Sequence, residues 1–90
     1  MGSVKTHRDL QIWQKSMDFV SMIYSSTNHF PDSEKFGLTS QARRAAVSVP
    51  ANIAEGYGRR SNGDFKRFLN ISMGSLFELQ TEIELTTRLG

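Results

Sequence analysis

The stretch from Gln41 to Arg60 limits, more than any other part of this 90-residue chain, what the chain can fold into. Small residues recur on one side of it at helical spacing, and Pro50 stands in its middle. Proline normally interrupts a helix, because it has no amide N–H and its ring crowds the carbonyl group four residues earlier. The apolar spacing nevertheless continues past Pro50, so we predict one kinked helix over residues 38–57. Gly56 and Gly58 are expected to end it.

Two further segments, 10–27 and 64–89, repeat apolar residues every three or four positions, as a helix with one buried face requires. On the first segment the apolar residues cover about half of the circumference, which is enough for two packing partners. Asp9 is its expected N-cap. Because the sequence nowhere keeps the alternation of a strand, we predict an all-α fold, an antiparallel up-and-down helical bundle with three helices in this chain. Residues 1–90 then form a single domain, with residues 1–8 flexible.

The segment 64–89 has small residues where bulky ones would fill a helix face. Ser72, Gly74 and Ser75 lie together in its middle. Glycine costs about 1 kcal/mol relative to alanine in a helix interior, so its presence needs a reason. We expect a close helix–helix crossing at this cluster, opposite the alanines of the helix over 38–57.

The side of the 38–57 helix that faces away from its shared apolar face is polar. Its members form a polar stripe within a narrow sector: Gln41, Arg44, Ser48, Asn52, Glu55 and Arg59. Glu55 and Arg59 have the four-residue spacing of a helical ion pair. Three interpretations stay open for this polar stripe. It is a salt-bridged surface or a hydrogen-bonded seam between helices, a line of contacts to a ligand or nucleic acid, or a polar contact between subunits.

Positive charge is concentrated in the middle of a nearly neutral chain. The net charge is +2, yet residues 43–67 hold six basic residues against two acidic ones. Basic zones attract phosphate groups, although most such clusters are simply solvated surface. The candidate nucleic-acid-binding residues are therefore Arg43, Arg44, Arg59, Arg60, Lys66 and Arg67. The last four flank one turn, and the first two lie about four helical turns away, so we expect two separate basic patches.

The sequence offers little for catalysis or cofactor binding. Cysteine is absent, which rules out disulfides and thiolate metal sites. His29 has no second metal ligand at a useful spacing, and no serine stands in a nucleophile motif. We expect no enzymatic activity, no cofactor and no bound metal. No run approaches the about 20 apolar residues that span a bilayer, and no secretory signal is visible, so we expect a cytoplasmic location without a membrane partner.

Four parts of the chain together resemble one bacterial family. In chain order, covering nearly the whole chain, they are Arg8 to Lys15, Phe30-Pro31 with Phe36 to Gln41, Arg43 to Ala45 with Ser48 to Gly56, and Phe65, Phe68 and Leu69 with Gly74 to Leu76 and Glu78-Leu79. The family is that of the proteins encoded by intervening sequences within 23S ribosomal RNA genes, the S23 family. The resemblance implies an antiparallel four-helix bundle that assembles as a ring, usually a pentamer.

The resemblance also implies the expected partners. Relatives of the family include accessory proteins of diversity-generating retroelements, which work with a reverse transcriptase and nucleic acid. Family members continue past the position of Gly90 into a fourth helix, so we expect either a shortened chain or another subunit in that place. The leading expectation is an oligomeric scaffold that binds RNA, DNA or a ribonucleoprotein, with a reverse transcriptase or another protein as partner. The alternative is a protein–protein adaptor without a nucleic-acid role.

Overall fold

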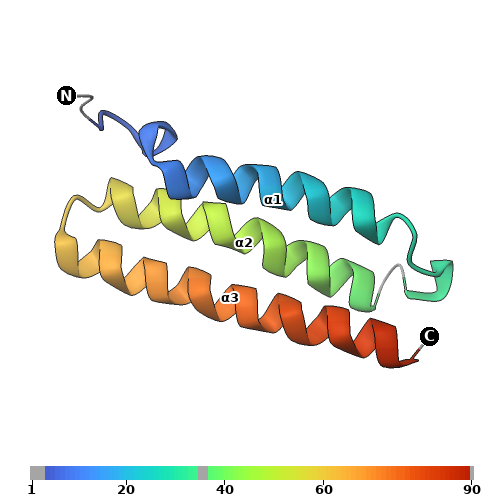
Figure 1. Cartoon of the computed structure of the whole chain (residues 1–90). Coiled ribbons are helices and arrows are strands. Elements are labelled where there is room, and N and C mark those ends of the chain that lie inside the picture. Colours follow the sequence, from blue (N-terminus) through green and yellow to red (C-terminus); the bar gives the residue numbers. More distant parts are fainter. Residues whose placement is uncertain (1–3, 35–36, 90) are drawn as a thin grey trace.

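A computed structural model of the protein describes residues 4–34 and 37–89, which form a row of three antiparallel helices (Figure 1). α2 lies in the middle, with α1 on one side and α3 on the other, and within the described residues no Cα atom of α1 lies within 8 Å of one in α3. This confirms the all-α prediction and the antiparallel order. The helices and two short 3-10 helices are η1 (His7–Asp9), α1 (Gln11–Thr27), η2 (Asp32–Glu34), α2 (Leu38–Gly58) and α3 (Asn62–Leu89).

Pro50 lies inside α2, as the apolar spacing around it predicted, and it is buried. The neighbouring carbonyl of Val49 accepts an extra hydrogen bond from the hydroxyl of Ser72 on α3, at 3.0 Å. Because Ser72 is itself buried, this bond satisfies a polar group in the interior while joining α2 to α3. The proline therefore stands next to an interhelical bond in an unbroken helix.

The core is small and consists largely of alanine. Its buried cluster contains Ile23 from α1, Leu79 from α3, and Ala42, Ala45 and Ala46 from α2. Alanines let the backbones of neighbouring helices approach, but they bury little apolar area, and Leu79 is the largest fully buried side chain. Several large apolar side chains are left at the surface instead.

Two expectations about glycine were wrong. Gly56 does not end α2; it is buried within it, and a Cβ atom at this position would lie 2.6 Å from the Cβ of Phe68 on α3. Gly56 therefore lies where the two helices approach each other closely. Gly74 is exposed, with nothing within 4 Å of where its Cβ would lie, so the crossing predicted there uses Ser72 and Ser75 without Gly74. Gly58 is the last residue of α2, as expected.

The start of α1 also differs from the prediction. Asp9 is not the N-cap; Leu10 occupies that position without a side-chain bond, and Asp9 closes a capping box with Thr6 around η1. Its carboxylate accepts the backbone N–H groups of Lys5 and Thr6 at 2.9 and 3.1 Å, and the bond from Lys5, followed by that from Thr6, lowers the pKa of Asp9. We expected residues 1–8 to be flexible. Residues 1–3 lie outside the described residues, whereas the Val4 carbonyl accepts the hydroxyl of Tyr57 at 3.2 Å.

Candidate nucleic-acid interface and two grooves

Four basic residues lie at and just after the turn between α2 and α3. This turn is at the end of the molecule where α1 begins (Figure 1). We call these residues, Arg59, Arg60, Lys66 and Arg67, the basic end, and all four are exposed. The turn is short because α3 begins at Asn62, and the hydroxyl of Ser61 accepts the backbone N–H of Asp64 at 3.1 Å. The basic end therefore surrounds the N-terminus of a long helix, whose dipole also favours anions.

Phe68 holds two of these arginines in place. The guanidinium carbons of Arg59 and Arg67 lie 5.2 and 4.6 Å from the centre of its ring. Each arginine also has an acidic neighbour on its own side of the turn, Glu55 at 3.0 Å and Asp64 at 3.7 Å. About half of each arginine side chain remains accessible, 48% and 57%. Exposed ion pairs contribute little free energy, so both guanidinium groups remain available to a phosphate.

Arg60 and Lys66 extend from the same end without such support. Neither forms a salt bridge with any residue in the described ranges 4–34 and 37–89. The backbone of Arg60 has a φ of 60°, the left-handed conformation that usually favours glycine just after a helix. An arginine at this position accepts backbone strain and adds a positive charge beyond the end of α2.

Arg43 lies at the other end of α2, and its guanidinium group is hydrogen-bonded to residues of and just after α1. Its Nε donates to the hydroxyl of Thr27 at 2.8 Å, and its Nη2 donates to the side chain of Asn28 at 2.8 Å and to the carbonyl of Tyr24 at 3.2 Å. The guanidinium also lies 4.6 Å from the centre of the Tyr24 ring. These groups belong to the C-terminal end of α1, where a cation is favourable. Arg43 thus joins the end of α1 to α2.

Arg44 faces a different side, because successive helical residues are turned by about 100°. It lines a polar groove of about 690 Å³ between α2 and α3. The groove contains part of the predicted polar stripe and adds residues of α3 that were not among the candidate site residues. Its lining is Gln41, Arg44, Ala45 and Ser48 on α2, with Ser75, Glu78 and Glu82 on α3. Arg43 and Arg44 therefore do not form one continuous basic patch.

The polar stripe is in part a hydrogen-bonded seam. The hydroxyls of Ser48 and Ser75 lie 2.8 Å apart, and the Asn52 amide donates to the Ser48 carbonyl and hydroxyl at 2.8 and 2.9 Å. Farther along, Arg59 pairs with Glu55, as their spacing predicted. The stripe thus combines a seam at Ser48 and Asn52 with an exposed ion pair at its end. Gln41 is exposed in the groove.

Glu82 is the buried carboxylic acid of the polar groove, and it was not among the candidate site residues. It is buried, with 7% of its surface exposed, and its Oε1 has no hydrogen-bond partner among the described residues. Burial raises the pKa of Glu82, and the negative charge of Glu78 raises it further. A signal was present in the sequence, because Glu82 follows Leu79 by three positions and so falls on the buried side of α3.

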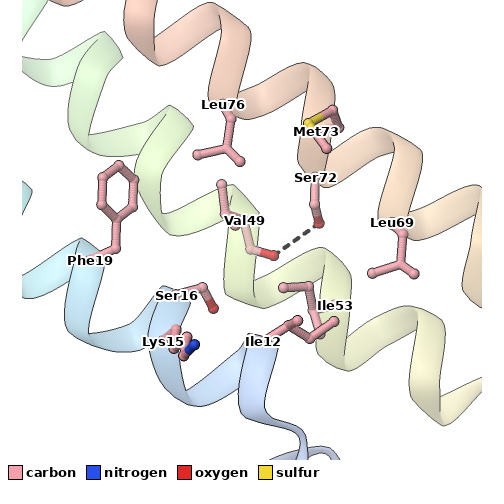
Figure 2. Close-up of a pocket in the computed structure, with 10 residues that line it drawn as sticks. All are labelled: Ile12, Lys15, Ser16, Phe19, Val49, Ile53, Leu69, Ser72, Met73 and Leu76. Atoms are coloured by element: carbon pink, nitrogen blue, oxygen red, sulfur yellow. Dashed lines mark hydrogen bonds between the residues drawn. The ribbon is translucent and has the colours of Figure 1, made fainter.

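An apolar groove of about 500 Å³ lies on another side of α2 (Figure 2). Figure 2 shows side chains from all three helices around it, with α2 between α1 and α3. The lining is mostly apolar: Ile12, Lys15, Ser16 and Phe19 from α1, Val49 and Ile53 from α2, and Leu69, Ser72, Met73 and Leu76 from α3. Ile12 and Met73 are 46% and 52% exposed at its edges. An open groove of this kind is typical of a surface that another element covers.

The part of the chain that the structure describes contains neither a cluster of metal-binding side chains nor a membrane-spanning helix. No three His, Cys, Asp or Glu side chains there are placed to hold a metal ion together. None of the described helices is both long enough and apolar enough to cross a membrane.

Comparison with known proteins identifies the family. A family model described as 23S rRNA-intervening sequence protein matches residues 8–90. The chain belongs to this family. The match includes all three helices, the basic end and both grooves, so the resemblance inferred from the sequence is confirmed. No curated protein matches the chain.

Proposed function

We propose that this member of the 23S rRNA-intervening sequence protein family is an oligomeric helical scaffold that binds nucleic acid or a ribonucleoprotein. The observation that carries the proposal is the basic end, where Arg59, Arg60, Lys66 and Arg67 surround the N-terminus of α3. Positive side chains and helix N-termini are the usual partners of phosphate groups. Membership of this family is consistent with a role connected to nucleic acid.

The four residues of the basic end have different roles in binding nucleic acid. Arg59 and Arg67 are held against Phe68 and present guanidinium forks that suit a phosphate. Arg60 and Lys66 extend beyond them and increase the positive field. Arg43 has a smaller share, because its guanidinium already binds the end of α1. Arg44 adds charge from the polar groove.

Self-association is the second part of the proposal. The apolar groove and the separation of the described helices α1 and α3 support it, because a second copy seated there would cover apolar surface that one chain leaves open. Repeating the basic end around an oligomer would raise affinity by multivalency. The ring, its pentameric state, a reverse transcriptase partner and a cytoplasmic location stay predictions from the sequence.

A binding assay with Arg59→Ala/Arg60→Ala tests the nucleic-acid part. Fluorescence anisotropy with generic single-stranded RNA and DNA at about 50 to 200 mM salt should show weaker binding of the variant to every sequence. Arg88→Ala is the control, because Arg88 is an exposed cation at the opposite end of α3. Equal affinity of the double variant and the unchanged protein, with the helical content intact, would favour the adaptor without a nucleic-acid role.

A further inference from the structure

The polar groove between α2 and α3 contains a buried carboxylate oxygen without a partner. Glu82 is more than nine-tenths buried, and its Oε1 receives no hydrogen bond from any residue within 4–34 or 37–89. The hydroxyl of Thr86, one turn later, donates at 3.0 Å to the backbone carbonyl of Glu82, not to its carboxylate. Buried polar groups nearly always have a partner, because leaving one unpaired is costly. A partner from outside this chain would remove that cost.

The other polar groups of the groove are Gln41 and Arg44 on α2, Glu78 on α3 and the Ser48–Ser75 pair. Glu78 lies one turn before Glu82 on α3 and lines the same groove. The Ser48 and Ser75 hydroxyls bond to each other, and Ser48 also accepts from Asn52, which leaves Ser75 with a spare lone pair. Two carboxyl groups therefore face one positively charged side chain, that of Arg44.

We infer that this groove binds an organic cation, a primary alkylammonium or guanidinium group, which donates hydrogen bonds to Glu82 and Glu78 and to the Ser48–Ser75 pair. Both groups carry several N–H donors and no acceptor, which suits two carboxyl groups of which one has an unpartnered buried oxygen. A guanidinium adds a planar fork that fits a carboxylate with two parallel bonds. The inference goes beyond the proposed function, because it concerns neither nucleic acid nor the basic end.

Other ligand classes fit this groove less well. An anion would meet two carboxyl groups, and its attraction to Arg44 alone does not offset them. A metal ion would find only Glu78 and Glu82, and the described residues hold no cluster of three metal-binding side chains. Arg44 lines the groove and forms no ion pair with a described residue, so it repels a bound cation. Removing its charge should therefore strengthen the binding of a cation and weaken that of an anion.

Binding should also depend on pH in a defined direction. Burial raises the pKa of Glu82, and a cation binds the ionised carboxylate better than the neutral acid. Affinity should therefore increase as the pH rises through the pKa of Glu82. The charged groups that face Glu82 in the groove are Glu78 on α3 and Arg44 on α2. An alkylguanidinium probe stays charged throughout, so the change reports on the protein.

Nuclear magnetic resonance on the whole ¹⁵N-labelled chain can test the inference with n-butylguanidinium and n-butylammonium as probes. n-Butylurea is the neutral control, because it has nearly the shape of the guanidinium without its charge. We expect saturable shifts of the backbone amides around Ser48, Ser75 and Glu82 with either cation and none with the urea. Saturation with inorganic phosphate instead, or equal shifts with the urea, would overturn the inference.

Matched variants locate the site. Glu82→Gln should weaken binding of the cation by about tenfold or more and remove its pH dependence, because the acceptor no longer carries a charge. Glu84→Gln is the control, because Glu84 is exposed on the same helix and does not line the groove. If Glu82→Gln changes the fold, Glu78→Gln replaces it, and it should also weaken binding of the cation because Glu78 lines the same groove. Arg44→Ala should strengthen binding. Equal affinities of the glutamine variants and the unchanged protein would overturn the inference.

The same assay can distinguish two sources of the cation, a free amine and a side chain of another protein. Putrescine represents a free amine, and N-acetyl-arginine amide represents a side chain of another protein. Tighter binding of either one supports the inference and identifies its source, and binding of neither contradicts it. Arg59→Ala/Arg60→Ala should leave both affinities unchanged, so a failure of this inference is distinguishable from a failure of nucleic-acid binding.

Discussion

Arg60 combines backbone strain with an exposed charge. A left-handed backbone costs a residue with a Cβ atom about 1 kcal/mol or more, and glycine avoids this cost. Arg60 has this conformation directly after α2, and its side chain is exposed. Nothing in the packing of the described residues requires an arginine there, whereas a phosphate-binding surface would use one. This is where stability and the proposed function oppose each other.

Arg60→Gly should therefore separate stability from binding. We expect the glycine variant to unfold at a higher temperature, by the equivalent of about 1 kcal/mol, because the left-handed backbone no longer carries a Cβ atom. We also expect it to bind nucleic acid more weakly, because the basic end then has one cation fewer. Thermal unfolding followed by circular dichroism and the anisotropy assay measure the two effects. A less stable variant with unchanged affinity would contradict both expectations.

Glu82 gives the stability of the protein a pH dependence of known sign. Burial, and next the charge of Glu78, raise its pKa in the folded state. Between the unfolded and the folded pKa the native state binds more protons, so stability falls as the pH rises through this window. Glu82→Gln should flatten that fall and be more stable than the unchanged protein at neutral pH. Urea unfolding at several pH values measures the effect, and parallel curves for the two proteins would refute it.

At the scale of helices, the sequence predicted which segments are helical but not which sides meet. The apolar spacing around Pro50 was sufficient to place the proline inside α2, and the described helices begin and end close to the predicted residues. The two glycine errors have different causes. Gly56 was expected to end α2 because glycine often follows the last turn of a helix, but α2 continues to Gly58. Whether Gly74 faces a neighbour depends on how α2 and α3 are rotated against each other, which spacing within one helix does not determine.

The candidate nucleic-acid-binding residues, like the helices, were predicted only in part. The basic end follows from the sequence, because Arg59, Arg60, Lys66 and Arg67 flank one short turn. The different surroundings of Arg43 and Arg44 could not be predicted in the same way, since they depend on where α1 ends and where α3 lies. Asp9 was misplaced for a local reason, because η1 inserts a short extra turn before α1.

Replacing each glycine by alanine tests the helix crossing. At Gly56 the new methyl group would meet Phe68 at 2.6 Å, so α2 and α3 must separate, and we expect stability to fall by about 1 to 3 kcal/mol. Gly74→Ala is the matched control, because nothing lies within 4 Å and alanine favours the helix by about 1 kcal/mol. Denaturant unfolding measures both. A stabilising Gly56→Ala would show that the helices do not cross closely there.

The whole molecule is an open row of helices, and this is the feature that favours assembly. α1 and α3 pack against α2 from two sides. Apolar residues of all three helices line a groove that no described residue covers. A core cluster of three alanines with Ile23 and Leu79 buries little apolar area for a chain of this size, so covering the groove would stabilise each copy. The small core and the open groove thus both favour self-association.

A charge placed in the apolar groove should weaken self-association. Light scattering should give a mass above that of one chain at micromolar concentration, and Met73→Lys should lower it, because Met73 lines the groove. Ile71→Lys is the control; Ile71 is exposed to a similar extent on the same helix but lies outside the groove. A monomer mass for the unchanged protein, or equal effects of the two lysines, would contradict a second copy in this groove.

If the basic end binds phosphate groups, its affinity for nucleic acid must fall as the salt concentration rises. Each phosphate of a single strand that the protein neutralises contributes about −0.7 to the slope of log affinity against log salt, because a counterion is released. The unchanged protein should therefore show a clearly negative slope with single-stranded RNA. Arg59→Ala/Arg60→Ala should flatten it by about 0.7 for every phosphate that the variant no longer neutralises, whereas Arg88→Ala should not. A slope near zero for the unchanged protein, or the same slope in all three, would contradict the claim.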